Sequence, residues 1–290
     1  MRSFMIQSAA CVLRVFNNNA VLVSVDGVKT VLAGRGIGFG KRPGDMIPAG
    51  GAWHQFIEAS ADRIDFLTSV NTLDPHLVST VTEAVELANN LINDLDPSIY
   101  VVLVDHMAFA VQRHLSGLSI HNKLVDEIKV AFGVEFTAAQ IMVHFVNHKL
   151  NVELPVDEVA FIALHLHAAR TGVTVKQPLS EANELGVIVD LIMRELGQPK
   201  NVELTELLFT INGYVTRIHA GMWRTNTATS LIERMLAPEF AVARHVITYI
   251  AKDDVPPAAI AHESAFLAVF LHGWRQGTRP AHTQKDTTTS

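Results

Sequence analysis

The chain has 290 residues, a length typical of about two domains. Apolar residues make up 49% of it and charged residues 18%, which provides for packed cores and excludes a wholly disordered chain. The single cysteine, Cys11, excludes an internal disulfide framework and is typical of a reducing cytosol. No run reaches the ~18 apolar residues of a membrane span, and the start lacks a secretory signal with a cleavage site. We therefore expect a soluble, cytoplasmic protein without membrane insertion.

The net charge of −6 is distributed unevenly. Residues 1–45 carry six basic and two acidic side chains, a net charge of +4 that leaves −10 for the rest of the chain. The basic ones are Arg2, Arg14, Lys29, Arg35, Lys41 and Arg42. A basic head on an acidic body predicts that the head, and not the body, binds a polyanion such as nucleic acid.

The head has the pattern of a small β-structure. Apolar stretches predict three strands, at residues 12–16, 20–25 and 28–33. Asp26-Gly27 between the last two is a strong hairpin signal, and Asn17-Asn18-Asn19 is a typical turn. A head this small has little core, so we expect it to need a second copy for stability.

After about residue 60 the apolar spacing becomes helical. Apolar residues recur every three or four positions in five segments, residues 73–95, 100–116, 122–132, 138–149 and 156–170. Breaks are expected at Asp96-Pro97, Gly117, Gly133 and residues 151–155. A linker at residues 172–177 precedes a second helical set from Ser180, and the polar tail from Pro280 is expected to be disordered.

The second helical set repeats the first. Residues 105–122 match 209–226 with an offset of 104, and residues 158–170 match 263–275 with an offset of 105. The identities are Val111/Val215, Arg113/Arg217, Gly117/Gly221, Asn122/Asn226, Glu158/Glu263, Ala160/Ala265, Phe161/Phe266, Ala163/Ala268, Leu166/Leu271, His167/His272 and Arg170/Arg275. The body is therefore predicted to be a duplicated helical module of about 105 residues.

The glycine-rich segment from Gly34 allows three interpretations. A phosphate-binding loop is disfavoured, because Gly40-Lys41 runs into Arg42-Pro43 instead of Ser or Thr opening a helix, and no βαβ unit follows. A plain glycine-rich turn and a backbone that approaches RNA both stay open. For RNA, alternate glycines bare the backbone N–H groups, Arg35 offers a bidentate guanidinium and Phe39 a stacking face.

Fourteen histidines raise the question of a metal site. A metal-dependent enzyme that uses His144, His148 and His165 is one hypothesis, but the sequence has no His-Glu-x-x-His motif and no cysteine ligand. We therefore expect no metal, no cofactor and no enzymatic activity. His106 and His165 lie on apolar helical faces where a plain core would have leucine, and the residues alone favour hydrogen-bonded core histidines.

Three motifs together resemble the BglG/SacY family of bacterial transcriptional antiterminators over nearly the whole chain. They are Arg14-Val-Phe-Asn-Asn-Asn19 with Gly34-Arg-Gly-Ile-Gly-Phe39, Asp105-His106 through Gln112-Arg113, and Glu158-Val-Ala-Phe-Ile-Ala-Leu-His165. The resemblance implies a small all-β RNA-binding head, a dimeric antiparallel sheet, followed by two tandem all-α helical-bundle regulation domains of the sugar phosphotransferase system (PTS). The implied domains are residues 1–62, 63–175 and 176–279, with a disordered tail at 280–290.

The resemblance also implies what the head binds. As a homodimer it would bind an antiterminator hairpin in nascent mRNA and prevent the overlapping terminator from folding, in a sugar operon that is commonly a β-glucoside operon. The implied RNA contacts are Arg14, Asn17, Asn19, Gly34, Arg35, Gly36 and Phe39. Loops of RNA offer the unstacked bases that such residues contact.

For the body, the resemblance implies inhibition by phosphorylation. His106 and His165 would accept phosphate from a PTS enzyme II permease, and neutral imidazole has the nucleophilic nitrogen that this requires. The second module departs from the family pattern, because the repeat places Thr210 opposite His106 and Phe270 opposite His165. In many family members this module receives activating phosphate from the phosphocarrier HPr. We expect that response to be lost here, and the second module mainly to support dimer contacts.

One alternative belongs to a different class. A PTS-regulated DNA-binding transcription activator would carry the same regulation domains behind a helix-turn-helix head. The hairpin at Asp26-Gly27 disfavours it, because the head then has no room for a recognition helix. Residues before Arg14 leave both Met1 and Met5 open as the start of translation.

Overall fold

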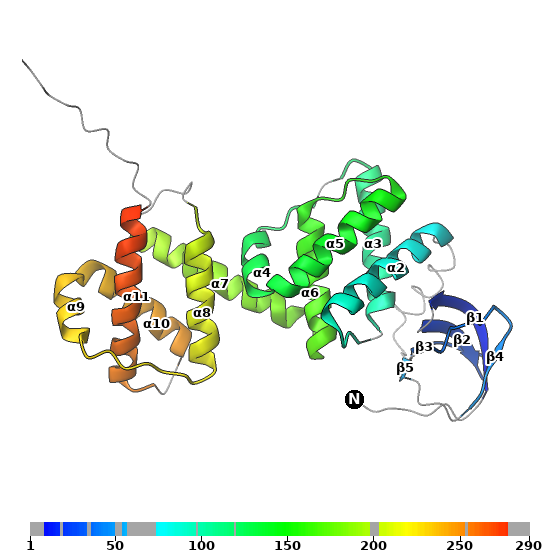
Figure 1. Cartoon of the computed structure of the whole chain (residues 1–290), viewed down its shortest axis with the longest axis horizontal. Coiled ribbons are helices and arrows are strands. Elements are labelled where there is room, and N and C mark those ends of the chain that lie inside the picture. Colours follow the sequence, from blue (N-terminus) through cyan, green and yellow to red (C-terminus); the bar gives the residue numbers. More distant parts are fainter. Residues whose placement is uncertain are drawn as a thin grey trace, which may run out of the picture. The chain divides into compact units, whose positions relative to one another are not determined.

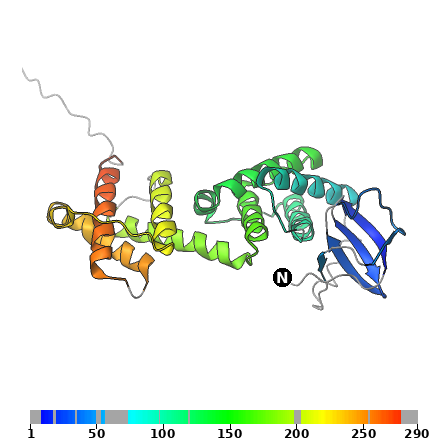
Figure 2. The same ribbon diagram turned by 60° about the horizontal axis from the view of Figure 1, so that its bottom comes forward.

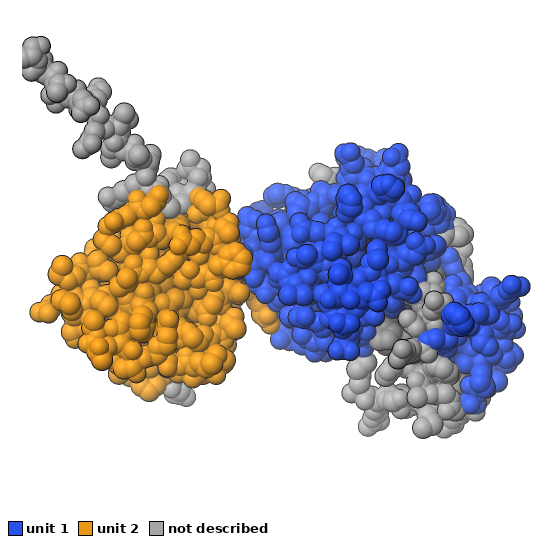
Figure 3. Space-filling model, viewed as in Figure 1, with its two compact units in different colours: residues 1–180 blue, residues 181–290 orange. Residues whose placement is uncertain are grey.

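The structure of the protein is a computed structural model that describes residues 9–17, 20–33, 36–49, 54–56, 74–96, 98–118, 120–197, 203–252 and 255–277 (Figure 1). Its described residues are mostly helical, with a small antiparallel sheet at the N-terminal end, as expected. The chain divides into two compact units, residues 1–180 and 181–290 (Figure 3).

The sheet has five strands in the described residues. They are β1 (Ala10–Asn17), β2 (Ala20–Val25), β3 (Val28–Ala33), β4 (Met46–Ile47) and β5 (His54–Phe56). Their order is β4-β1-β2-β3-β5, every neighbouring pair is antiparallel, and Figure 2 gives a second view of the sheet. The three strands predicted from the apolar stretches are therefore confirmed.

Asp26 and Gly27 close the hairpin between β2 and β3, as predicted. Val25 pairs with Val28, so Asp26 and Gly27 form the whole loop. Both have positive φ, 50° for Asp26 and 82° for Gly27. A two-residue hairpin turn of this kind needs positive φ at both positions, which Gly adopts freely and Asp tolerates better than most residues.

Two bulges shift the register of β1, and the one between Val12 and Arg14 decides which face Arg14 occupies. Val12 pairs with Val23, Arg14 with Leu22, and Val15 with Val21. Directly paired residues lie on the same face, so Arg14 lies with Leu22, opposite the face of the paired valines. Strict alternation would have placed Arg14 on the same face as Val12, and the register shift between these two residues prevents this.

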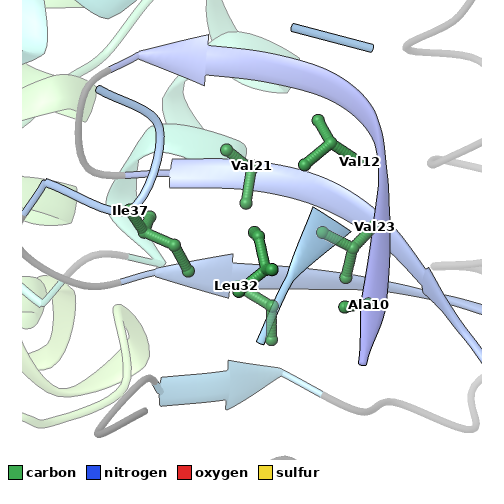
Figure 4. Packing of buried hydrophobic residues seen from close by; sticks show 7 residues of the cluster. Ala10, Val12, Val21, Val23, Leu32 and Ile37 are labelled. Atoms are coloured by element: carbon green, nitrogen blue, oxygen red, sulfur yellow. The ribbon is translucent and has the colours of Figure 1, made fainter. Parts of the chain in front are cut away.

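The core of the head is small. Alternate residues of β2, Val21 and Val23, point to one face, where the neighbouring strands add further apolar side chains. The buried cluster consists of Ala10, Val12, Val21, Val23, Leu32, Ile37 and Ile47 (Figure 4). Ile37 brings the glycine-rich segment into this core.

Unit 1 also contains five helices among its described residues. They are α2 (Pro75–Ile92), α3 (Ile99–Leu115), α4 (Val125–Ala131), α5 (Gly133–Leu150) and α6 (Val156–Thr171). The Asp74 side chain caps α2 by accepting the His76 N–H, and α6 ends at Gly172 in the left-handed region. The predicted break at Gly133 was wrong by one residue. Gly133 opens α5, and the break is at Phe132, where ψ leaves the helical range.

Further helices follow from Lys176. They are α7 (Lys176–Glu195), α8 (Thr205–His219), α9 (Thr229–Met235), α10 (Ala237–Ala251) and α11 (Pro257–Gly277), and within unit 2 α10 packs against α8, α9 and α11 (Figures 1 and 2). The second helical set thus begins at Lys176 and not at Ser180, because Pro178 is tolerated in the first turn of a helix. The boundary between the compact units falls inside α7.

The same buried ion pairs occur in both helical sets. Glu135, at the start of α5, contacts His167 Nδ1 at 3.0 Å and Arg170 at 2.6 Å. Glu239, at the start of α10, contacts His272 and Arg275, each at 3.3 Å. Burial opposes ionisation of both carboxyls, but their histidine and arginine partners hold the pKa of each below its usual value. These pairs recur at the offsets of the sequence repeat and support the duplication.

No single helix among the described residues is long and apolar enough to cross a bilayer. The helices α4 and α5, which are bent by 118° at their junction, reach that length and apolar composition only when taken together.

Candidate functional site

The described part of the head contains four of the seven expected RNA contacts. Arg14 is half-buried on β1, Asn17 ends that strand, and Gly36 and Phe39 are exposed in the turn that follows β3. Asn19, Gly34 and Arg35 lie outside the described residues. Between residues 9 and 56 the described residues form only strands and turns, whereas the DNA-binding alternative requires a recognition helix.

The turn holds Phe39 outward. The Phe39 N–H donates to the Gly36 carbonyl at 3.1 Å, and the preceding Ile37 is buried in the core. Two backbone hydrogen bonds attach the end of the turn to β1, from Gly44 N–H to the Val12 carbonyl and from Val12 N–H to the Asp45 carbonyl. Phe39 is 74% exposed on this fixed frame. An exposed aromatic ring on a fixed backbone suits stacking on an unpaired base.

A second candidate site lies between α3 and α6, where the structure brings His106 and His165 together. Their ring centroids are 5.4 Å apart and the rings are tilted by 57°. Phe161 lies beside His106, with 6.2 Å between ring centroids. Both histidines therefore belong to one site, although 59 positions separate them in the sequence.

Glu158 connects His106 to the positively charged guanidinium of Arg113. Its carboxylate is 2% exposed and lies 2.9 Å from His106 Nε2, and it accepts a hydrogen bond of 2.7 Å from the Arg113 guanidinium. Burial opposes ionisation of the Glu158 carboxyl, yet His106 and Arg113 together keep its pKa below the usual value. An ionised carboxylate only accepts hydrogen bonds, so His106 donates from Nε2, and in the neutral imidazole the lone pair is then on Nδ1.

The charge state of His165 follows from its surroundings. Burial, and then the adjacent His106, lower the pKa of His165 to about 4. The ring is therefore neutral near pH 7 and retains a nucleophilic nitrogen. It also lines an open cavity of about 570 Å³ together with Ser98, Val102 and Val173.

Asp105, the residue before His106, faces a different cavity. That cavity has a volume of about 720 Å³ and is also lined by Phe109 and Gln112. Burial raises the pKa of the Asp105 carboxyl, which the neighbouring His106 partly offsets.

The metal hypothesis does not match the placement of its three histidines. His144 and His148 line a cavity of about 530 Å³ with His114, whereas His165 lines the cavity beside α3. No group of three or more His, Cys, Asp or Glu side chains in the described ranges is placed to hold a metal ion.

The second unit has the same carboxylate but not the histidines. Thr210 on α8 and Phe270 on α11 occupy the expected histidine positions, and both are half-buried. Glu263 is fully buried and accepts 2.8 Å hydrogen bonds from both Arg217 and Arg224. Arg217 corresponds to Arg113 in the repeat, so Arg224 takes the place that His106 has beside Glu158.

Aromatic rings hold Arg224 in this position. Its guanidinium carbon lies 4.3 Å from the ring centroid of Phe266 and 5.0 Å from that of Tyr214. Burial raises the pKa of the Tyr214 hydroxyl, and that ring is thus a neutral face for the cation. Arg224 is not among the residues predicted from the sequence, because it lies where the first module has Ile120. One sequence signal could have pointed to it. The repeat keeps the glutamate, as Glu263, but replaces the histidine partner by Thr210, so another cation is needed beside Glu263.

Comparison with known proteins places both candidate sites in matched domains. The CAT RNA binding domain matches residues 11–61, and the PRD domain matches residues 82–169. The first match spans all seven expected RNA contacts. The second spans His106, Arg113, Glu158 and His165.

Related whole proteins include two that are named as antiterminators. The chain is 30% identical over 210 residues to a beta-glucoside operon antiterminator of Dickeya chrysanthemi, covering 71% of this chain and 73% of that protein. It is 34% identical over 164 residues to the transcription antiterminator LicT of Bacillus subtilis, covering 53% of this chain and 57% of LicT. A crystal structure of GlcT CAT-PRDI is 32% identical, with a TM-score of 0.42, and covers 57% of this chain and 99% of that one. The chain thus belongs to the BglG/SacY family of transcriptional antiterminators, with a CAT RNA-binding domain followed by a PRD domain.

Proposed function

We propose that this protein is a homodimeric antiterminator that binds a hairpin in nascent mRNA, and that PTS phosphorylation of His106 and His165 inhibits it. The target is a sugar-utilisation operon, and the name of the relative from Dickeya chrysanthemi favours a β-glucoside operon. The head comprises residues 1–62. Two tandem helical-bundle regulation domains follow, at residues 63–175 and 176–279.

The head supplies the RNA contacts in this proposal. Phe39 offers an exposed ring for a loop base, and the β-bulge places Arg14 on the face opposite the apolar core. Asn17, Asn19, Gly34, Arg35 and Gly36 complete the set within the matched CAT domain. The excess of basic side chains in residues 1–45 attracts phosphate groups, so binding should weaken as salt concentration rises. The small core supports pairing of two heads in the active form.

The observation that carries the regulatory part is the pair of imidazoles beside a buried carboxylate. His106 and His165 each have a nucleophilic nitrogen, and the enzyme II permease that transports the sugar is the proposed phosphate donor. A phosphoryl group carries nearly two negative charges near neutral pH, by analogy with other phosphorylated residues.

That charge would act against Glu158. A phosphoryl group of charge about −1.5 on His106 Nδ1 would lie some 6–7 Å from the carboxylate that Nε2 contacts, and it is repelled by about 4 kcal/mol at an effective dielectric of about 20. A bias of this size lowers a state populated to about 99% to roughly 10%. Phosphorylation would therefore weaken the contact of Glu158 with its partners and disfavour the dimer that binds RNA. Sugar transport drains phosphate from the permease and restores the active form.

The second regulation domain is proposed to be insensitive to phosphate from HPr. Thr210 and Phe270 have no nucleophilic nitrogen, and Arg224 gives Glu263 a cation whose charge does not change near neutral pH. If radiolabel from phosphorylated HPr persists in a His106/His165 double variant and maps to residues 178–279, this part of the proposal is wrong.

A terminator-reporter fusion in cells tests the proposal as a whole. His106→Asp places a negative charge at the phosphorylation site and should lower read-through. Arg35→Ala should lower it by removing an RNA contact. Read-through at or above the wild-type level in His106→Asp would contradict the inhibitory role of phosphorylation.

A further inference from the structure

The imidazoles of His106 and His165 lie close enough to act on the same group. Their ring centroids are 5.4 Å apart, and the packing of α3 on α6 sets this separation. A phosphoryl group on one ring therefore lies beside the other. Transfer of a phosphoryl group needs little more than two nucleophilic atoms placed on either side of phosphorus and roughly in line with it.

Both rings have a nitrogen that is able to accept phosphate. The hydrogen bond from His106 Nε2 to Glu158 leaves a lone pair on His106 Nδ1. His165 is neutral near pH 7, since burial and the adjacent His106 lower its pKa to about 4. The neutral His165 ring does not have to lose a proton before it attacks phosphorus.

Charge disfavours two phosphoryl groups at once. The two groups would lie on neighbouring rings, one of which contacts the buried Glu158 carboxylate, and the Arg113 guanidinium is already hydrogen bonded to that carboxylate. With a charge of about −1.5 on each group, repulsion at this ring separation disfavours the second phosphorylation by on the order of 100-fold or more.

We infer that His106 and His165 form one shared acceptor, which carries a single phosphoryl group that passes between the two rings. This inference rests on the proposed function, in which the two histidines are the sites of PTS phosphorylation. It adds that the two sites are occupied in turn and never independently.

The transfer balances without a further reactant. The N–P bond at His106 Nδ1 breaks, and its electron pair returns to that nitrogen, while a lone pair of His165 forms the new N–P bond. The proton on His106 Nε2 stays in the hydrogen bond to Glu158, so the departing ring leaves as neutral imidazole. The proton on the other nitrogen of His165 passes to water in the cavity that this ring lines.

The stoichiometry of phosphorylation tests the inference. The full-length chain, His106→Gln, His165→Gln and the double variant are incubated with excess potassium phosphoramidate, a small reagent that phosphorylates histidine, and the intact masses are measured. The other histidines are common to all four proteins and cancel in the comparison. A shared acceptor predicts equal uptake by the wild type and each single variant, one phosphoryl group above the double variant.

Three other patterns overturn the inference. Independent sites give the wild type one group more than each single variant and two more than the double variant, which leaves the proposed function intact. A single variant that falls to the level of the double variant means that only one ring accepts phosphate. Equal uptake by all four proteins means that neither does, and this overturns the proposed function as well.

Two further measurements sharpen the test. His148→Gln is the matched control, because His148 is an exposed histidine on α5 outside the pair, and its loss should leave the differences among the four proteins unchanged. The transfer itself predicts two phosphohistidine signals that exchange in ³¹P NMR of the wild type. Two signals without exchange overturn the transfer between the rings.

Discussion

Replacing Glu158 by Gln should damage stability and phosphorylation together. The substitution keeps the shape of the side chain but removes the charge that holds Arg113 at 2.7 Å and His106 at 2.9 Å. Removal of one partner from a fully buried ion pair costs about 3–5 kcal/mol. Arg113 is 31% and His106 18% exposed, so water compensates part of the loss, and we expect about 3 kcal/mol.

The rate of phosphorylation of His106 should fall because the Glu158 carboxylate sets the tautomer of that imidazole. An amide can donate to Nε2 as well as accept from it, and the lone pair on Nδ1 is then no longer enforced. We expect His106 to be phosphorylated at least ~10-fold more slowly, as when the orienting carboxylate of a catalytic histidine is replaced by its amide. The assays are urea unfolding and the initial rate of phosphate uptake at His106.

Glu263→Gln is the matched control in unit 2. Glu263 is buried and bonded to Arg217 and Arg224, so this variant should lose a similar amount of stability. It should leave the rate of phosphate uptake at His106 unchanged. Wild-type uptake in Glu158→Gln, or an equal slowing in Glu263→Gln, would refute the reasoning.

Three further predictions concern the head, pH and the second unit. Phe39→Ala should weaken binding of the RNA hairpin by ~1–3 kcal/mol through lost base stacking, without a loss of protein stability. Met46 is another exposed apolar residue of the head, and Met46→Ala should change neither RNA binding nor stability. Equal effects of the two substitutions in a binding titration would contradict this prediction. His165 has a pKa of about 4 in the folded state and about 6.5 in the unfolded state. Its contribution to the free energy of unfolding is therefore complete above pH 6.5 and falls by up to about 3 kcal/mol as the pH drops to 4. His165→Gln should flatten that part of the stability curve, and an unchanged slope would count against a neutral His165. The double variant Thr210→His/Phe270→His should leave unit 2 without phosphate label from HPr. Adding Arg224→Ile should permit labelling, because Glu263 then loses its hydrogen bonds from Arg224 and is available to a histidine. Equal labelling of the double and triple variants would contradict the role of Arg224.

Local sequence patterns predicted the elements well. Asp26-Gly27 specified its hairpin because few residues accept positive φ at two successive positions, and three- and four-residue spacing located the five helices from α2 to α6. The start of the second helical set was misplaced, because a proline in a first turn resembles a helix breaker when only the sequence is read. The bulges in β1 left no sequence signal, since a register shift depends on pairing between strands.

The candidate site was predictable only in part. His106 and His165 came from the family resemblance, and their residues alone favoured core histidines. The pairing of Glu158 with both Arg113 and His106 depends on how α3 packs on α6, and spacing along the chain does not encode it. Arg224 could not be found by alignment of the repeats, because it replaces a histidine from a different position in the sequence.

The most direct test of the account is the affinity of the full-length protein for an antiterminator stem-loop, measured by fluorescence anisotropy before and after phosphorylation at His106 and His165. The account predicts a salt-sensitive preference for the stem-loop over duplex DNA of the same sequence, and a loss of that preference on phosphorylation. The double His106→Gln/His165→Gln variant should bind the stem-loop whether or not it has been treated with the phosphate donor. Equal affinity for the stem-loop in the phosphorylated and unphosphorylated wild type would contradict the account.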